Sequence, residues 1–351
     1  MTERLIELAF ALQKAAPWEH LADNDIFAVR LRSGQVGYCS VMGNAGSHYA
    51  LGLYVGPNGW NTYLNIATMA QVEDDRDEMI QIMRQLDCIN CDFEHPSNMA
   101  AGASKEAVFA YAKKNFMSVS GGVRLPDFIR HSPLMFPTPD VNGRDAEDME
   151  DALEVAVAVA LALKKTYLSA LGFSEKGIRA SDRPGQTIPC FTPGKKCTSS
   201  FEMVELPGRT PVEFPKPTFD RIELAMAISQ LPYGADLECR QVVVNAPVMK
   251  EDGSAFFPLM LLIVDGRTGY VRISKAGESS NDTISDEVTE LAMNIIGAKA
   301  RPHKIFVQDD RTEALLGEFC RKCGITLHRA SHLKHLRDAW SSLNRWLEQG
   351  R

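Results

Sequence analysis

Residues 240–275 read RQVVVNAPVMKEDGSAFFPLMLLIVDGRTGYVRISK, and their pattern predicts the first strands of the C-terminal half. Its apolar and β-branched residues form three short segments, Arg240 to Val248, Phe257 to Val264 and Tyr270 to Lys275. Turn-forming residues separate the segments, Asp252-Gly253 before the second and Asp265 to Gly269 before the third. Short strand-like runs bounded by Asp-Gly turns are typical of hairpins. The stretch therefore predicts a three-stranded antiparallel meander.

The residues on either side of this meander show helical and strand patterns. Helical spacing of apolar residues predicts one helix before it and three after it, and short β-branched runs predict two further strands. In chain order these are Phe219 to Leu231 (helix), then Ser285 to Ala300 (helix), Lys304 to Gln308 (strand), Thr312 to Cys323 (helix), Ile325 to Arg329 (strand) and His332 to Glu348 (helix). Gly324 suits the left-handed position that ends a helix. From the meander onward, the predicted order is βββαβαβα.

The N-terminal half also combines a meander with helices. Thr2 is a suitable N-cap for a first helix, because apolar residues recur at helical spacing between it and Pro17. Strand-like segments follow at Ile26 to Arg32, Val36 to Met42 and Tyr49 to Val55. Helical patterns at Asp74 to Leu86, Lys105 to Phe116 and Glu147 to Leu171 come next, with a strand-like segment at Cys88 to Phe93. The fold class predicted is α+β, with two domains that are each an antiparallel meander packed with helices.

A stretch rich in proline and glycine, Gly172 to Pro217, separates the two halves. Proline fixes φ and removes a backbone donor, so a long helix or a central strand here would be costly. We expect an irregular connector with one strand-like segment at Ser200 to Leu206. The predicted organisation is an N-terminal domain at 1–171, the connector at 172–217 and a C-terminal domain at 218–351.

Composition points to an ordinary globular protein. The 351 residues are 45% hydrophobic and 24% charged with a formal charge of −7, which argues against disorder and against a generally nucleic-acid-binding body. The longest apolar run, Val155 to Leu163, is about half of the roughly 20 residues that cross a bilayer, so we expect no membrane segment. Glu3 before the N-terminal apolar stretch and Glu7 within it argue against a signal peptide. We therefore expect a cytoplasmic protein whose eight cysteines are reduced.

The order of strands and helices from about Arg240 to Glu348 resembles the ribonuclease-H-like superfold of many nucleases and transposases. Arg301 to Asp310, RPHKIFVQDD, looks like the fourth strand of such enzymes, where a carboxylate at the strand end binds a metal ion. Those enzymes also carry an aspartate within the first strand, because two metal ions need carboxylates from neighbouring strands. The predicted first strand contains Asn245 and no acid, so the resemblance implies the fold with an incomplete metal site. Glu238 and Asp265 flank the meander and are the acids that would have to replace it.

The chain as a whole resembles a bacterial two-domain family of unknown function. The residues that carry this resemblance are Asp25-Ile26-Phe27, Gly37 to Gly43, Leu53 to Gly56 and Arg301 to Asp310. This resemblance implies no activity.

Two Cys-x-x-Cys pairs, Cys88 with Cys91 and Cys320 with Cys323, are candidate zinc ligands, because four thiolates complete a tetrahedral shell. The first pair lies in a strand pattern, where residues three apart point to opposite faces, and the second lies inside a predicted helix. Buried core thiols are therefore the favoured interpretation, and zinc is not expected. Further metal alternatives are His95 beside Cys91, the pair Cys190 and Cys197, and His332 with His335 and Asp338.

The segment from His328 to Arg337 contains basic residues and no acid before Asp338. Its members His328, Arg329, Lys334 and Arg337 are candidates for binding the phosphates of a nucleic acid. A solvated helix face explains them more simply, because no aromatic residue is interleaved with them.

Asp309 and Asp310 are the acids with the strongest context, and they admit two interpretations. They bind a metal ion, or Asp310 caps the helix that starts near Thr312. The favoured hypothesis is a non-catalytic binding or interaction protein without a cofactor. The alternative is a nuclease or phosphoryl-transfer enzyme that uses Mg²⁺ or Mn²⁺ with Asp309, Asp310 and Asp338, and a second alternative is a zinc-stabilised protein.

Overall fold

The computed structural model describes residues 1–69, 76–139, 141–174, 185–273 and 276–349. The chain divides into two compact units, each with its own sheet and core. Unit 1 comprises residues 1–133 and 137–210, and unit 2 comprises residues 134–136 and 211–351. Among the described residues, no helix is long and apolar enough to span a membrane.

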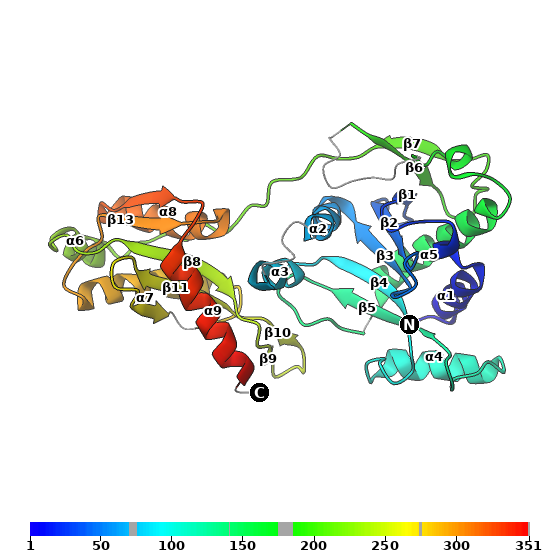
Figure 1. Cartoon of the computed structure of the whole chain (residues 1–351), viewed down its shortest axis with the longest axis horizontal. Coiled ribbons are helices and arrows are strands. Elements are labelled where there is room, and N and C mark those ends of the chain that lie inside the picture. The colour runs from blue at the N-terminus through cyan, green and yellow to red at the C-terminus, as the bar shows by residue number, and fades with distance from the viewer. Residues whose placement is uncertain (70–75, 140, 175–184, 274–275, 350–351) are drawn as a thin grey trace. The chain divides into compact units, whose positions relative to one another are not determined.

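Unit 1 contains a seven-stranded sheet in the order β5-β4-β3-β2-β1-β6-β7 (Figure 1). The strands are β1 (Phe27–Arg30), β2 (Val36–Met42), β3 (Ala50–Val55), β4 (Cys88–Glu94), β5 (Leu125–His131), β6 (Thr187–Phe191) and β7 (Glu202–Glu205). Neighbouring strands are antiparallel except for β1 and β6, which are parallel. A parallel pair needs a crossover connection, and here the chain passes through helices between the two strands. The sheet is therefore mixed, and the expectation of a purely antiparallel sheet was wrong.

Helices cover both faces of this sheet. The helices α1 (Glu3–Ala15), α4 (Ala103–Lys114) and α5 (Gly143–Leu163) pack on one face around a core that includes Phe27 and Phe128. The helix α2 (Gly56–Thr68), with α3 (Arg76–Met83) beside it, packs on the other face, where Trp60 and Tyr54 are buried. Short 3-10 turns lie at Pro17–Glu19 and Leu168–Leu171. The predicted cap of α1 is confirmed, because Thr2 accepts a hydrogen bond from the Leu5 amide.

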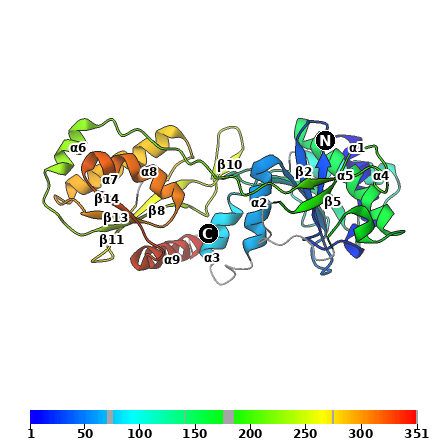
Figure 2. The same cartoon turned by 90° about the horizontal axis from the view of Figure 1, so that it is seen from above.

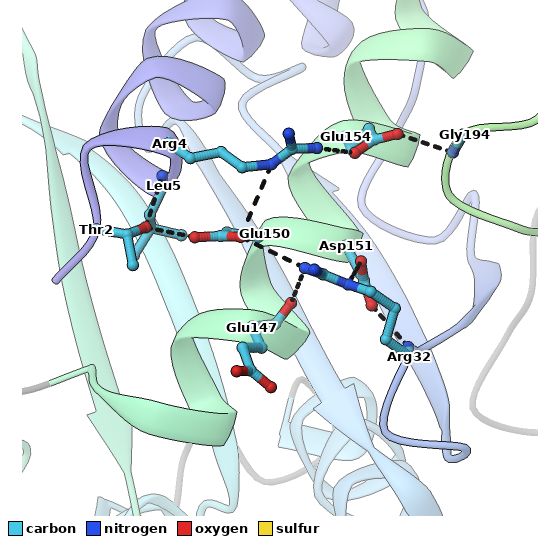
Figure 3. A network of polar contacts seen from close by, with 9 residues as sticks. All are labelled: Thr2, Arg4, Leu5, Arg32, Glu147, Glu150, Asp151, Glu154 and Gly194. Atoms are coloured by element: carbon cyan, nitrogen blue, oxygen red, sulfur yellow. Dashed lines mark hydrogen bonds and ion pairs between the residues drawn. The ribbon is translucent and has the colours of Figure 1, made fainter.

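Polar contacts fix α5 to three other segments of unit 1 (Figure 3). The carboxylate of Asp151 accepts hydrogen bonds from Nε and from the backbone amide of Arg32, both at 2.7 Å. The neighbouring Glu150 accepts from the Thr2 hydroxyl, and Glu154 contacts Arg4 and the amide of Gly194. These acids of α5 therefore hold the start of α1, the β1–β2 turn and the loop after β6.

The predicted connector is only partly irregular. Its described part contributes β6 and β7 to the first sheet, with Ile188, Cys190 and Phe191 buried. Residues 175–184 of the connector lie outside the described residues. The sequence pattern concealed β6 because Pro189 interrupts it, although Cys190 and Phe191 still pair with β1.

Unit 2 contains a five-stranded sheet in the order β12-β11-β8-β13-β14. The strands are β8 (Leu237–Val243), β11 (Leu259–Asp265), β12 (Val271–Ile273), β13 (Lys304–Val307) and β14 (Thr326–Arg329). The first three form the predicted antiparallel meander, and β13 and β14 run parallel to β8. A separate two-stranded hairpin, β9 (Val248–Met249) and β10 (Ala255–Phe256), lies between β8 and β11 in sequence. This sheet is also mixed.

The helices of unit 2 also lie on both faces of its sheet (Figure 2). The helices α6 (Ile222–Ser229), α7 (Asn281–Gly297) and α8 (Asp310–Cys323) pack on one face around Leu261 and Phe319. The helix α9 (Lys334–Gln349) packs on the other face, where Trp340 is buried. Gly324 adopts the left-handed conformation that ends α8, as predicted.

Candidate functional site

Asp309 lies between β13 and α8; its Oδ1 is hydrogen-bonded, whereas its buried Oδ2 makes no hydrogen bond with the described residues and has an ion-pair contact instead. Its Oδ1 accepts hydrogen bonds from the Thr312 amide at 2.8 Å and from the Thr312 hydroxyl at 2.9 Å. Its Oδ2 lies 3.3 Å from Nε of Arg240. Asp309 is therefore the N-cap of α8 and half of an ion pair. The prediction that Asp310 is the cap was one residue out of register.

The other acids named from the sequence serve separate local contacts. Asp310 is exposed and pairs with Arg329. Glu238 accepts a hydrogen bond from the Leu336 amide at 2.8 Å, near the start of α9. Asp265 accepts the amides of Arg267 and Thr268, which closes the turn after β11. Asp338 is exposed on α9.

The position of β8 corrects the sequence analysis. The strand begins at Leu237, three residues earlier than expected, and so it does contain an acid, Glu238. Pairing with β13 extends the strand at this end, which local propensity alone did not show. Phe306 pairs with Glu238, and continuing this register along the two parallel strands places Gln241 level with Asp309. Glu238 therefore lies about 10 Å along the strand from that level, at roughly 3.3 Å per residue.

At the level of Asp309, unit 2 contains a buried polar network that the sequence analysis missed. Nε2 of Gln241 donates to Oε2 of Glu287 at 2.6 Å, and the Gln241 amide donates to the Thr312 hydroxyl at 2.9 Å. Glu287 is 1% exposed, and burial raises its pKa to about 7 against the opposing hydrogen bond from Gln241. Its position three residues after Ile284, on the apolar stripe of α7, was the available signal.

Two arginines supply positive charge to this network. Arg240 contacts Asp309, and Arg311 interacts electrostatically with both Asp309 and Glu287. Burial lowers the pKa of Arg311, and the two carboxylates oppose that effect. The two carboxylates thus have two guanidiniums as their counter-charges, which is a poor fit to the paired divalent ions that the fold resemblance implies.

The cysteine pairs are placed as core residues. Cys88 and Cys91 lie on opposite faces of β4, in the two different cores of unit 1. Cys320 and Cys323 are both buried in the core of unit 2. Burial raises the pKa of Cys88 to about 12 and that of Cys323 to about 11, as expected for thiols packed in apolar cores. Within the described part of the chain, no three His, Cys, Asp or Glu side chains are grouped to hold a metal ion.

The basic segment is partly neutralised by neighbouring acids. Arg329 on β14 pairs with Asp310 and lies 3.1 Å from Glu313. His328, Lys334 and Arg337 are exposed.

A pocket of about 560 Å³ lies in unit 1, and Cys88, a candidate zinc ligand from the sequence, is among the residues that line it. Its lining comes from the ends of β3, β4 and β5, the first turns of α2 and α5, the residue Gln35 and the residue Thr210. Within it, Arg130 pairs with Asp87 at 2.6 Å and with Asp145 at 3.3 Å. These residues are far apart in sequence, so no local motif could have revealed the pocket.

Two family models match the chain, one for each half. Residues 3–177 match the model described as Domain of unknown function (DUF7309), and residues 226–344 match the model described as Domain of unknown function (DUF6930). No curated protein and no solved structure matches the chain. The chain therefore joins two domains of unknown function, one in the N-terminal half and one in the C-terminal half.

Proposed function

We propose that this chain is a non-catalytic binding protein, in which unit 2 has a ribonuclease-H-like arrangement without a working metal centre. The observation that supports this most strongly is the pair of contacts made by Asp309. One oxygen caps α8, and the other lies 3.3 Å from Arg240. Arg240 thus occupies the place beside Oδ2 where a bridging carboxylate would hold metal ions about 3.5 to 4 Å apart.

The side chains beside Asp309 add support. A guanidinium cannot be deprotonated in a protein, so Arg240 and Arg311 repel a divalent cation at physiological pH. At the same level, β8 offers the amide of Gln241 in place of a carboxylate, and that amide is already bonded to Glu287. The nearest acid on β8 is Glu238, which serves α9.

The alternative is a nuclease or phosphoryl-transfer enzyme that uses Mg²⁺ or Mn²⁺. One observation favours it, because Gln241 and Thr312 connect the carboxylates of Glu287 and Asp309 through hydrogen bonds. In this alternative the metal ion displaces Arg240 from Asp309.

A cleavage assay separates the two proposals. The full chain is incubated with Mg²⁺ or Mn²⁺ and single- or double-stranded DNA or RNA, beside the variants Asp309→Asn, Glu287→Gln and Asp286→Asn. Asparagine is as good an N-cap as aspartate, so Asp309→Asn removes the charge and keeps α8. We expect intact substrate in every sample. Cleavage that is lost in Asp309→Asn and Glu287→Gln but kept in Asp286→Asn, an exposed control on α7, would overturn the proposal.

A further inference from the structure

A short strap, residues 207–210, follows β7 in unit 1 and has no helix or strand of its own. Side chains of α2 bind three of its backbone groups. Nε1 of Trp60 donates a hydrogen bond to the backbone oxygen of Pro207 at 2.9 Å. Nδ2 of Asn61 donates to the backbone oxygen of Thr210 at 2.7 Å, and Oδ1 of Asn61 accepts from the Thr210 amide at 3.0 Å. Asn61 therefore binds both backbone groups of one strap residue.

The side chains of α2 that hold the strap are buried, whereas those of the strap are not. Trp60 and Asn61 are 2% and 5% exposed, and residues 208–210 are exposed. The side chain of Arg209 makes one further contact, with Oδ1 of Asn65 at the surface of α2. The strap is thus held mainly by hydrogen bonds and buries little apolar surface. A segment of this kind can open locally at a lower free-energy cost than global unfolding.

The strap forms part of the wall of the unit 1 pocket. Thr210 lines this pocket of about 560 Å³ together with Asn58, in the first turn of α2, and Cys88, at the start of β4. Before the strap, Leu206 is buried in the same apolar cluster as Trp60 and Cys88. Movement of the strap away from α2 would therefore remove a lining residue from the pocket and open it to more water.

We propose that the strap is a lid on the unit 1 pocket and that Asn61 is the residue that holds this lid closed. When the lid opens, the freed donors and acceptors bond to water, so each lost hydrogen bond costs only its modest net contribution. The Leu206 amide donates to the backbone oxygen of Gln186 at 2.7 Å, and this bond keeps the chain before the strap attached to the sheet. The lid lies in unit 1 and does not depend on whether unit 2 is catalytic.

Limited digestion of the full chain with trypsin measures the opening of the lid, because trypsin cleaves after Arg209 only when the residues around that bond are free to enter its active site. We expect cleavage at Arg209 to be at least about tenfold faster in Asn61→Ala than in wild type, which is the effect of roughly two hydrogen bonds. Trp60→Phe keeps an aromatic ring in the core and loses one hydrogen bond, so cleavage should be about threefold faster. Asn58→Ala is the matched control, with the same substitution at an exposed position of α2, and should behave as wild type.

Alkylation by iodoacetamide measures access to the pocket through Cys88. Burial raises the pKa of Cys88 to about 12, so its thiol should react slowly while the lid is closed. Water that enters the open pocket lowers this pKa toward its ordinary value, and we expect Cys88 to react several-fold faster in Asn61→Ala. Cys91 lies in the other core of unit 1 and is an internal control whose rate should not change.

Equal cleavage at Arg209 in wild type and Asn61→Ala would overturn the role of Asn61, and unchanged alkylation of Cys88 would overturn the role of the lid in access to the pocket. If Cys88 and Cys91 become reactive together in Asn61→Ala, the substitution has unfolded unit 1, and Trp60→Phe then decides. Faster cleavage at Arg209 in Trp60→Phe with an unreactive Cys91 supports the lid, and any other result overturns it. None of these results bears on the metal centre of unit 2, which the cleavage assay with nucleic acid tests separately.

Discussion

Asp92 on β4 and Asp127 on β5 lie directly opposite each other on the sheet of unit 1. They are 7% and 3% exposed, and Oδ1 of each makes no hydrogen bond with the described residues. Burial, followed by repulsion from Asp127 and Glu94, raises the pKa of Asp92 to about 7. Burial and Glu94 raise the pKa of Asp127 to about 6. The charge of Lys105 partly opposes the raised pKa of Asp127, and the half-exposed ring of His48 lies 3.6 Å from Oδ1 of Asp92.

This pair predicts a pH dependence of stability. Both folded-state pKa values lie above the ordinary value of 3.8. Between pH 3.8 and the folded-state values of about 6 and about 7, the folded protein therefore binds more protons than the unfolded chain. The free energy of unfolding should therefore fall as pH rises from about 4 to about 7 and then level off. Urea unfolding across this range measures it.

The variant Asp92→Asn isolates the contribution of the pair. It should raise the free energy of unfolding at pH 8 by on the order of 1 to 3 kcal/mol, because a neutral amide replaces a destabilised carboxylate. The free energy of unfolding should also change less steeply with pH than in wild type. The exposed Glu147→Gln serves as the control. A slope in Asp92→Asn as steep as in wild type would mean that the pair is not the source.

The contact between Arg32 and Asp151 predicts a loss of stability in unit 1. Asp151→Ala leaves the Arg32 amide without its acceptor and should lower the free energy of unfolding by about 2 kcal/mol. Glu147 contributes only its backbone oxygen to this network, and its side chain points away in Figure 3, so Glu147→Ala should change little. Equal losses in the two variants would show that the network is not what stabilises this region.

Gly59 in α2 predicts a second, steric effect. A Cβ at this position would lie 2.5 Å from the carbonyl carbon of Tyr54, so Gly59→Ala must displace α2 from β3. We expect a lower melting temperature, by several degrees for a loss of roughly 2 kcal/mol. In α8, Gly317 has open space around its Cβ position, and Gly317→Ala should instead be neutral or stabilising by up to about 1 kcal/mol. We expect Gly59→Ala to lower the melting temperature and Gly317→Ala to leave it unchanged or raise it. A Gly59→Ala variant that is more stable than wild type would contradict the packing described.

Features with strong local signals could be predicted from the sequence. The helix cap at Thr2, the helix end at Gly324 and the turn from Asp265 to Gly269 are all found as expected. In each case the residue type strongly favours one local conformation. Features decided by tertiary pairing were not predicted. The start of β8 and the strand β6 depend on neighbours distant in sequence, and Pro189 weakened the signal for β6.

The candidate sites show the same division. Asp309 was identified because a strand end followed by a helix start is visible in the sequence. The pocket of unit 1 depends on Asp87, Arg130 and Asp148, which come together from the residue before β4, from β5 and from α5, and no spacing rule connects them. Glu287 was overlooked because a single acid on an apolar helix stripe has no meaning until its partner Gln241 is known.

We propose that Asp309 serves α8 and Arg240 and does not bind a catalytic metal ion. Electron paramagnetic resonance of Mn²⁺ titrated into the full chain tests this most directly, because free and bound Mn²⁺ give different signals. We predict that wild type and Asp309→Asn bind the same amount of Mn²⁺. One or two tightly bound Mn²⁺ ions per chain in wild type that disappear in Asp309→Asn would contradict the claim.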